Sequence, residues 1–235
     1  MLDLEFSRNA QDLREGVGYP LDRASEFTKV VSEVFDELAI DQSWSATKEE
    51  NLALMRTIQP SRGAAVVAAA KDEGVNFLEW LAHHRAVGFE HVFVYTNGNR
   101  DGSDALYELL ARNGLITYIQ NKTGPVASPQ VKAYEHSIHF LRELRDFEWV
   151  AYLDIDEFVV PSRTYDYSIC NLLQALKRTY PDAVPGAICF NWDWYGSGGM
   201  VMREHGLVQD RFNHSTPHPL VKSVSNCSPR VVLGR

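Results

Sequence analysis

Short apolar runs alternate with longer amphipathic stretches along the chain from residue 64 onward. The short runs carry few polar residues, as is typical of strands that are buried on both faces of a sheet. The longer stretches repeat apolar residues at spacings of three and four, which indicates helices with one buried face. The predicted strands are 64–70, 91–97, 116–121, 149–153 and 187–196, and the predicted helices are 77–88, 103–114, 129–146 and 169–180.

This alternation is typical of right-handed β-α-β crossovers. We therefore predict an α/β fold in which a Rossmann-like, mostly parallel sheet carries helices on both faces. Local signals support the helix assignments: Pro129 stands in a first turn, Asn76 and Glu79 form a capping pair, and Gly88 ends that helix.

The first 62 residues have a different character and are predicted to form a helical N-terminal extension. They hold two charged amphipathic stretches, 24–39 and 47–58, and a Thr47/Glu50 capping box opens the second. The segment QPSRG then breaks the pattern, so we place the boundary there and assign 63–235 to one main domain.

Composition narrows the choice of partners and compartment. The formal charge is 23 − 31 = −8, which argues against nucleic acid or an anionic membrane as the main partner. Three widely spaced cysteines do not suggest a disulfide framework and fit a reducing compartment. The first residues are charged where a signal peptide is apolar, and no later run is apolar enough to span a bilayer. We expect a cytoplasmic protein, at most peripheral to a membrane.

Polar residues follow each of the first four predicted strands. They are Asp72, the segment 97–101, Asn121 and the segment 154–157. The carboxyl ends of parallel strands meet at one edge of a sheet, and ligands of such folds bind in the crevice beyond that edge. The sequence therefore predicts a ligand site there.

The segment Asp-Ile-Asp-Glu after the fourth strand predicts a metal site. If the strand continues, Asp154 and Asp156 point to the same side and repel each other unless a cation lies between them. Oxygen ligands favour Mg²⁺ or Mn²⁺, which would link the acidic site to a substrate diphosphate. Glu157 would point away and cap or brace a neighbour. The alternatives are acidic residues that merely end a strand, or a carboxylate pair for hydrolysis.

Three blocks of the sequence carry a resemblance to a known family: KDEGVNFLEWLAHHRAVGFEHVFVYTNGNRDGSDAL, ASPQVKAYEHS and EWVAYLDIDEFVV. In this order they resemble the glycosyltransferase family 2-like proteins, in the branch whose signature begins Lys-Asp-Glu. The resemblance covers about residues 64–233 and is far more specific than Asp-x-Asp alone. It implies a GT-A fold.

The resemblance also implies an activity and a set of site residues. The activity is transfer of a sugar from a nucleotide diphosphate sugar, most often a UDP-sugar, to an acceptor hydroxyl such as that of a glycan. The DID segment would be the family's DXD motif, with Asp156 on the metal and Asp154 on the metal or the donor ribose. Asp72 and Asp101 match residues that contact the base and ribose, and Gln130 opens a helix near the donor.

Three later segments also resemble the family: NWDWYGSGG, GLVQDRF and VKSVSNCSPRVV. Two features depart from its pattern. Met200 stands where relatives often have histidine, and the sequence stops at Arg235, before the C-terminal histidine that completes the metal site in relatives. We therefore expect a domain that is cut short, or one whose third metal ligand comes from elsewhere.

Several residues between 192 and 222 are further candidates. Arg211 and Lys222 could stabilise the leaving diphosphate, or could be ordinary surface charges. His218 is our candidate for a third metal ligand, since histidine suits Mn²⁺, although a single histidine is more often a surface residue.

Two aromatic residues and one acidic residue complete the candidates. Trp192 and Trp194 could stack on a sugar ring or belong to the core. Asp193, between them, would face the opposite way; it is our candidate for the base that deprotonates the acceptor, or is an ordinary surface aspartate. His83 and His84, adjacent on a helix, are interpreted as packing or surface residues.

Two other functions remain open at this point. A nucleotidyltransferase also uses a parallel sheet and acidic metal ligands, but it normally has a basic glycine-rich loop after its first strand, where this chain has Lys-Asp-Glu-Gly. A catalytically silent module that binds a nucleotide sugar is the third hypothesis. For the donor base we predict uracil, because the carboxylate of Asp72 can accept a hydrogen bond from uracil N3–H, which cytosine lacks. Guanine also offers N–H donors and is the competing base, and the alternative role for Asp72 is to cap the helix that follows it.

Overall fold

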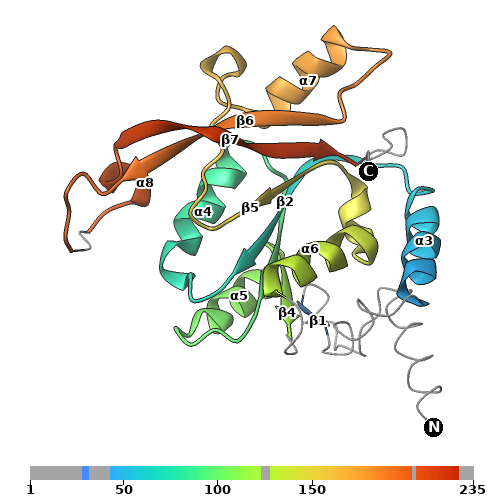
Figure 1. The fold of residues 1–235 in the computed structure, drawn as a ribbon, viewed down its shortest axis with the longest axis horizontal. Coiled ribbons are helices and arrows are strands. Elements are labelled where there is room, and N and C mark those ends of the chain that lie inside the picture. Colours follow the sequence, from blue (N-terminus) through green and yellow to red (C-terminus); the bar gives the residue numbers. More distant parts are fainter. Residues whose placement is uncertain (1–27, 32–42, 123–127, 203–204, 228–235) are drawn as a thin grey trace.

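Figure 1 shows the computed structural model, which describes residues 28–31, 43–122, 128–202 and 205–227. Within these residues seven strands form one sheet in the order β1-β4-β3-β2-β5-β7-β6. The first five in this order are parallel, whereas β7 is antiparallel to both β5 and β6. The strands are β1 Thr28–Val31, β2 Arg62–Ala70, β3 His91–Thr96, β4 Thr117–Asn121, β5 Phe147–Leu153, β6 Ala187–Gly196 and β7 His214–Asn226.

Helices cover both faces of this sheet. Alternate residues of β2 point to opposite faces, so Val66 and Ala68 pack with Trp80 in one core cluster, and Val67 packs with Ala133 in the other. Helices α4, α5 and α7 contribute to the first cluster and α6 to the second. The helices are α3 Ser43–Met55, α4 Gly74–Ala86, α5 Ser103–Arg112, α6 Pro129–His139, α7 Ile169–Thr179 and α8 Val208–Arg211, with short 3₁₀ helices at Arg142–Asp146 and Arg163–Tyr165.

The predicted α/β fold with a mostly parallel sheet and helices on both faces is confirmed. The five predicted strands lie within about two residues of β2 to β6. The runs that became β2 to β5 are largely buried, whereas β6 is largely exposed. No helix in the ranges that the structure describes has the length and apolar character needed to cross a membrane.

The prediction for the N-terminal segment was partly wrong. Part of the expected helix 24–39 is strand β1, which pairs in parallel with β4 at the edge of the sheet; the rest of that segment lies outside the described residues. The second expected helix exists, but α3 begins at Ser43, so Thr47 lies inside the helix and not at the start where it was predicted. Lys48 of this helix forms an ion pair with Glu135 of α6. The division of the chain at residue 62 stays a prediction.

Two further details differ from the sequence prediction. Helix α4 begins at Gly74, so Asn76 and Glu79 lie inside it and are not its capping pair; its end before Gly88, at a φ of 106°, is as predicted. Strand β7 was not predicted, because prolines at 217 and 219 interrupt its pattern. The pairing with β6 shifts there, from Asn191 opposite Val221 to Trp192 opposite His218, and this irregularity accommodates the prolines.

Candidate active site

The acidic segment after β5 forms a tight turn. The strand ends at Leu153, and the backbone N–H of Glu157 donates to the carbonyl of Asp154 at 3.1 Å. Ile155, in the middle, is buried and anchors the turn in the core. The expectation that the strand continues through Asp154 and Asp156, which would point both to the same side, was therefore wrong. Asp154 is half-buried, Asp156 is exposed, and the side chain of Glu157 folds back into the protein.

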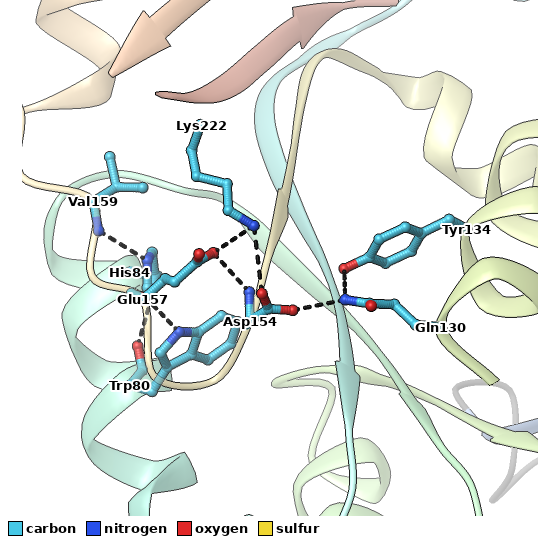
Figure 2. Close-up of polar contacts among 8 residues, drawn as sticks. All are labelled: Trp80, His84, Gln130, Tyr134, Asp154, Glu157, Val159 and Lys222. Carbon is cyan, nitrogen blue, oxygen red and sulfur yellow. Dashed lines mark hydrogen bonds and ion pairs between the residues drawn. The ribbon is translucent and has the colours of Figure 1, made fainter. Parts of the chain in front are cut away.

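A lysine from β7 joins two carboxylates of this turn (Figure 2). The ammonium of Lys222 lies 2.9 Å from Glu157 Oε2 and 3.4 Å from Asp154 Oδ2. Glu157 Oε2 also accepts the backbone N–H of Asp154 at 3.0 Å. Burial raises the pKa of Glu157, although these donors oppose the shift. Burial lowers the pKa of Lys222, but the two carboxylates outweigh it and the net shift is upward.

The N-terminus of α6 supplies a third partner for the turn. Gln130 Nε2 donates to Asp154 Oδ1 at 2.8 Å, and Tyr134 OH lies 3.1 Å from the same nitrogen. Thus the two carboxylate oxygens of Asp154 have different partners, Gln130 on one side and Lys222 on the other (Figure 2). The structure therefore brings together three residues that the sequence predicted for the site, from three separate elements.

Helix α4 holds the turn from the opposite side. Trp80 Nε1 donates to the carbonyl of Glu157 at 2.8 Å, and His83 Nε2 lies 2.9 Å from the carbonyl of Val159. The N–H of Val159 donates to His84 Nε2 at 3.4 Å, so Nε2 is the unprotonated ring nitrogen. The proton is therefore on Nδ1, which donates to the Trp80 carbonyl. The interpretation of the two histidines as packing residues is confirmed, and their packing partner is the segment that follows the acidic turn.

The burial of His84 predicts a loss of stability in acid. Burial lowers its pKa from 6.5 to about 3, so the unfolded chain takes up a proton below pH 6.5 while the folded protein does not. Between pH 7 and pH 5, wild type should lose roughly 2 kcal/mol more unfolding free energy than His84→Asn, whose side chain does not titrate. Urea unfolding at both pH values checks this. His91, whose pKa is also lowered, is present in both proteins, so its contribution to the difference between them cancels. Equal losses of unfolding free energy in wild type and His84→Asn would contradict the prediction.

The strand ends of β2 and β3 lie next to this turn and are also acidic. Asp72 Oδ1 accepts the backbone N–H of Arg100 at 2.6 Å, and Oδ2 lies 3.2 Å from the Arg100 guanidinium; this backbone hydrogen bond is the main cause of its lowered pKa. Strands β2 and β5 pair up to Ala68 opposite Leu153, so the turn after β5 lies beside the end of β2. Burial and the charge of Asp156 raise the pKa of Glu73 there.

Asp101 has a structural role at this edge. Its carboxylate accepts the N–H of Ser103 on one oxygen and the N–H of Gly74 on the other, both at 3.0 Å. It therefore joins the first residues of α5 and α4, and the hydrogen bonds from Ser103 lower its pKa. The predicted nucleotide-contacting pair, Asp72 and Asp101, thus lies at the predicted edge of the sheet with its oxygens already partnered by the protein.

The ribbon of β6 and β7 carries the aromatic candidates on one face. The Trp194 ring is stacked on the His218 ring, with centroids 4.3 Å apart and planes at 16°, and Trp192 meets both edge-on. The Lys222 ammonium lies 5.7 Å from the centroid of the Trp192 ring. The side chains of Trp192, His218 and Trp194, which we call the aromatic row, therefore extend along the ribbon from the acidic turn. Asp193, being adjacent to both tryptophans in the strand, points to the other face of the ribbon and is exposed.

Two other candidates lie apart from the turn. Arg211 ends α8 and lies against Phe212, its guanidinium carbon 5.4 Å from the ring centroid, and it has no described hydrogen bond to Asp154 or Lys222. His218 packs with Trp192 and Trp194 and has no described contact with Asp154 or Asp156. Among the described residues, no group of three or more His, Cys, Asp or Glu side chains could hold a metal ion. His218 as a third ligand stays a prediction.

Sequence reasoning missed two site-building roles. Glu79, expected to cap its own helix, accepts the N–H groups of Val208 and Gln209 at 2.7 and 3.1 Å and so fixes α8 to α4. Glu157, expected to brace a neighbour, is the buried partner of Lys222. The pairing of residues 157 and 222 had no signal in the sequence, because it depends on how β7 returns beside β5.

Comparison with known proteins identifies the family. The family model of Glycosyltransferase family 92 matches residues 68–224, which is more than half of the chain. Glycosyltransferase family 92 proteins of Arabidopsis thaliana, Ricinus communis and Oryza sativa subsp. japonica are 26%, 30% and 29% identical over 52%, 37% and 34% of this chain. These matches span only 21%, 15% and 13% of the relatives' own lengths. The crystal structure of S. aureus TarS matches 51% of this chain and 20% of that chain, with a TM-score of 0.36 and 17% identity.

The matched range runs from within β2 to Val224 of β7 and contains the acidic turn, Gln130 and Lys222. The resemblance pointed to a glycosyltransferase family, and the match to a glycosyltransferase family is confirmed. The family shown is family 92, whereas the prediction named the family 2-like proteins. Because this family model covers more than half of the chain, from the end of β2 through the acidic turn to Val224 of β7, the chain belongs to glycosyltransferase family 92.

Proposed function

We propose that this protein transfers a sugar from a nucleotide diphosphate sugar to an acceptor hydroxyl. The family match supports sugar transfer, and the observation that carries the site is the meeting of Asp154, Gln130 and Lys222 at the carboxyl edge of the sheet. An ammonium beside a carboxylate at this edge suits a donor that brings both a diphosphate and a cation. The matched part of the curated relatives is small, so the activity is a proposal for this chain.

Mn²⁺ or Mg²⁺ fits the residues of the turn. Asp156 is exposed, and its charge already acts on Glu73, so a divalent cation would relieve repulsion among carboxylates at this edge. Mg²⁺ is commonly bound by one or two carboxylates together with substrate phosphates, which suits the two aspartates of this turn. Asp156, and Asp154 with it, would hold the ion. Bound there, it would act as a Lewis acid on the departing diphosphate.

The chain's own residues would bind and orient the donor. Lys222 would neutralise the diphosphate, with Arg211 as a second cation if α8 approaches the bound donor. Asp72 would accept the N3–H of uracil, which favours UDP-sugars, and Asp101 would contact the ribose. The Asp72 side chain is 27% exposed and its Arg100 partner 82% exposed, so the arginine is free to yield to a ligand.

The aromatic row would bind the sugars. Trp194 is 58% exposed and lies beyond Trp192 as seen from Lys222, a position suited to the ring of an acceptor glycan. Asp193 as the catalytic base has less support, because it points to the face of the ribbon away from Lys222. An acceptor that wraps around the ribbon, or another base, would be required.

The proposal is tested by offering the protein UDP-, GDP- and CDP-sugars with Mn²⁺ and oligosaccharide acceptors. We expect release of nucleoside diphosphate, fastest with a UDP-sugar, and its loss when a chelator removes the metal. Binding of UDP without turnover would instead indicate a silent binding module. Pyrophosphate release from nucleoside triphosphates would indicate a nucleotidyltransferase.

A further inference from the structure

The feature that calls for explanation is the burial of Glu157. Its side chain is only 8% exposed, although it follows three residues that form an acidic turn at the edge of the sheet. Burying a carboxylate is costly even when it is paired, and an apolar residue of similar size is often as stable or more stable. Oxygen Oε1 has no hydrogen-bond partner among the described residues, so the arrangement is not optimised for stability. The carboxylate is therefore more costly than a purely structural role requires.

What Glu157 achieves is to fix the position of Lys222. The lysine side chain has a long flexible stem, and its ammonium ordinarily points into solvent. Here Glu157 Oε2 holds the ammonium at 2.9 Å, next to Asp154, and the Trp192 ring lies on another side. Glu157 is itself fixed, because Trp80 binds its carbonyl and its carboxylate binds the N–H of Asp154 (Figure 2).

We propose that Glu157 is a positioning residue that holds the Lys222 ammonium beside Asp154, where it meets the diphosphate of the donor. This inference rests on the proposed function. Glu157 itself lies behind Lys222, buried, and does not touch the substrate. Its effect should therefore fall on the diphosphate and leave the nucleoside unaffected.

Glu157→Gln is the sharpest test. Glutamine keeps the shape and an acceptor for the Asp154 N–H but removes the charge that holds Lys222. Titration calorimetry in Mn²⁺ with UDP and with uridine separates the diphosphate from the nucleoside. We expect UDP affinity to fall about tenfold, corresponding to about 1.4 kcal/mol, while uridine affinity stays unchanged. A residue that only stabilises the turn would change both affinities or neither.

Three further variants complete the experiment. Lys222→Met should lose UDP affinity to a similar degree, and the double variant should lose little more, because both changes remove one interaction. Glu148→Gln, which breaks the ion pair between Glu148 of β5 and Lys177 of α7, is the matched control and should leave both affinities unchanged. If Glu157→Gln folds poorly, Glu157→Met replaces the buried carboxylate with an apolar side chain and should show the same selective loss.

The outcomes separate the two proposals. A wild-type protein that binds UDP, with an unchanged UDP-to-uridine ratio in folded Glu157 variants, overturns the positioning role alone. A wild-type protein that binds neither UDP nor any other nucleoside diphosphate overturns the proposed function and the positioning role with it.

Discussion

Replacing Asp156 with alanine is expected to abolish the Mn²⁺-dependent binding of UDP while the protein stays folded. The side chain is exposed on the acidic turn, and its charge already disfavours the ionised form of Glu73, so its removal relieves repulsion and costs no packing. Loss of a direct metal ligand should exceed the roughly 10–100-fold effect of changes in a second shell. Calorimetry with and without Mn²⁺, together with thermal unfolding, measures both parts of the prediction.

Asp182→Ala is the matched control, because Asp182 is also exposed but lies in the loop between α7 and β6. It should change neither metal-dependent binding nor unfolding. If Asp156→Ala bound UDP with the same metal dependence as wild type, the metal would have to be placed elsewhere, and Asp154 would be the next residue to replace.

Trp80→Ala is expected to destabilise the protein by about 3–5 kcal/mol. Trp80 is completely buried on α4, stacks near Phe77 and His84, and donates the hydrogen bond that holds the Glu157 carbonyl. Denaturant unfolding measures the loss directly. It should be accompanied by weaker UDP binding, because the acidic turn loses its support from the helix.

Trp80→Phe separates the contribution of aromatic packing from that of the hydrogen bond to the Glu157 carbonyl. Phenylalanine keeps most of the aromatic volume but leaves the Glu157 carbonyl without its donor, which should cost about 1–3 kcal/mol. Leu78→Ala, an exposed position on the same helix at 53% exposure, should stay within about 0.5 kcal/mol of wild type. A Trp80→Phe variant as stable as wild type would show that the hydrogen bond to the turn is dispensable.

Much of the fold could be predicted from local patterns. Strands β2 to β5 were recognisable because each is a short, largely apolar run, and their parallel arrangement followed from the helices between them. Strand β6 was also predicted, although it is largely exposed and pairs antiparallel with β7. Strand β1 was misread as helix: TKVV lies in a stretch with helical spacing, and only pairing with β4 selects the extended form. Strand β7 was missed because its prolines obscure the alternation, and a bulge in the pairing makes them tolerable.

The sequence by itself determined the class of the fold, the edge at which polar residues gather and the acidic segment after β5. These depend on the order of residues along one element, where side-chain direction follows from periodicity. Only the tertiary structure decided that the segment turns, that Glu157 is buried and that Lys222 reaches it. That lysine comes from a strand that runs back antiparallel to β5, 65 positions further along the chain, and no local pattern encodes which of several exposed cations will meet a given carboxylate.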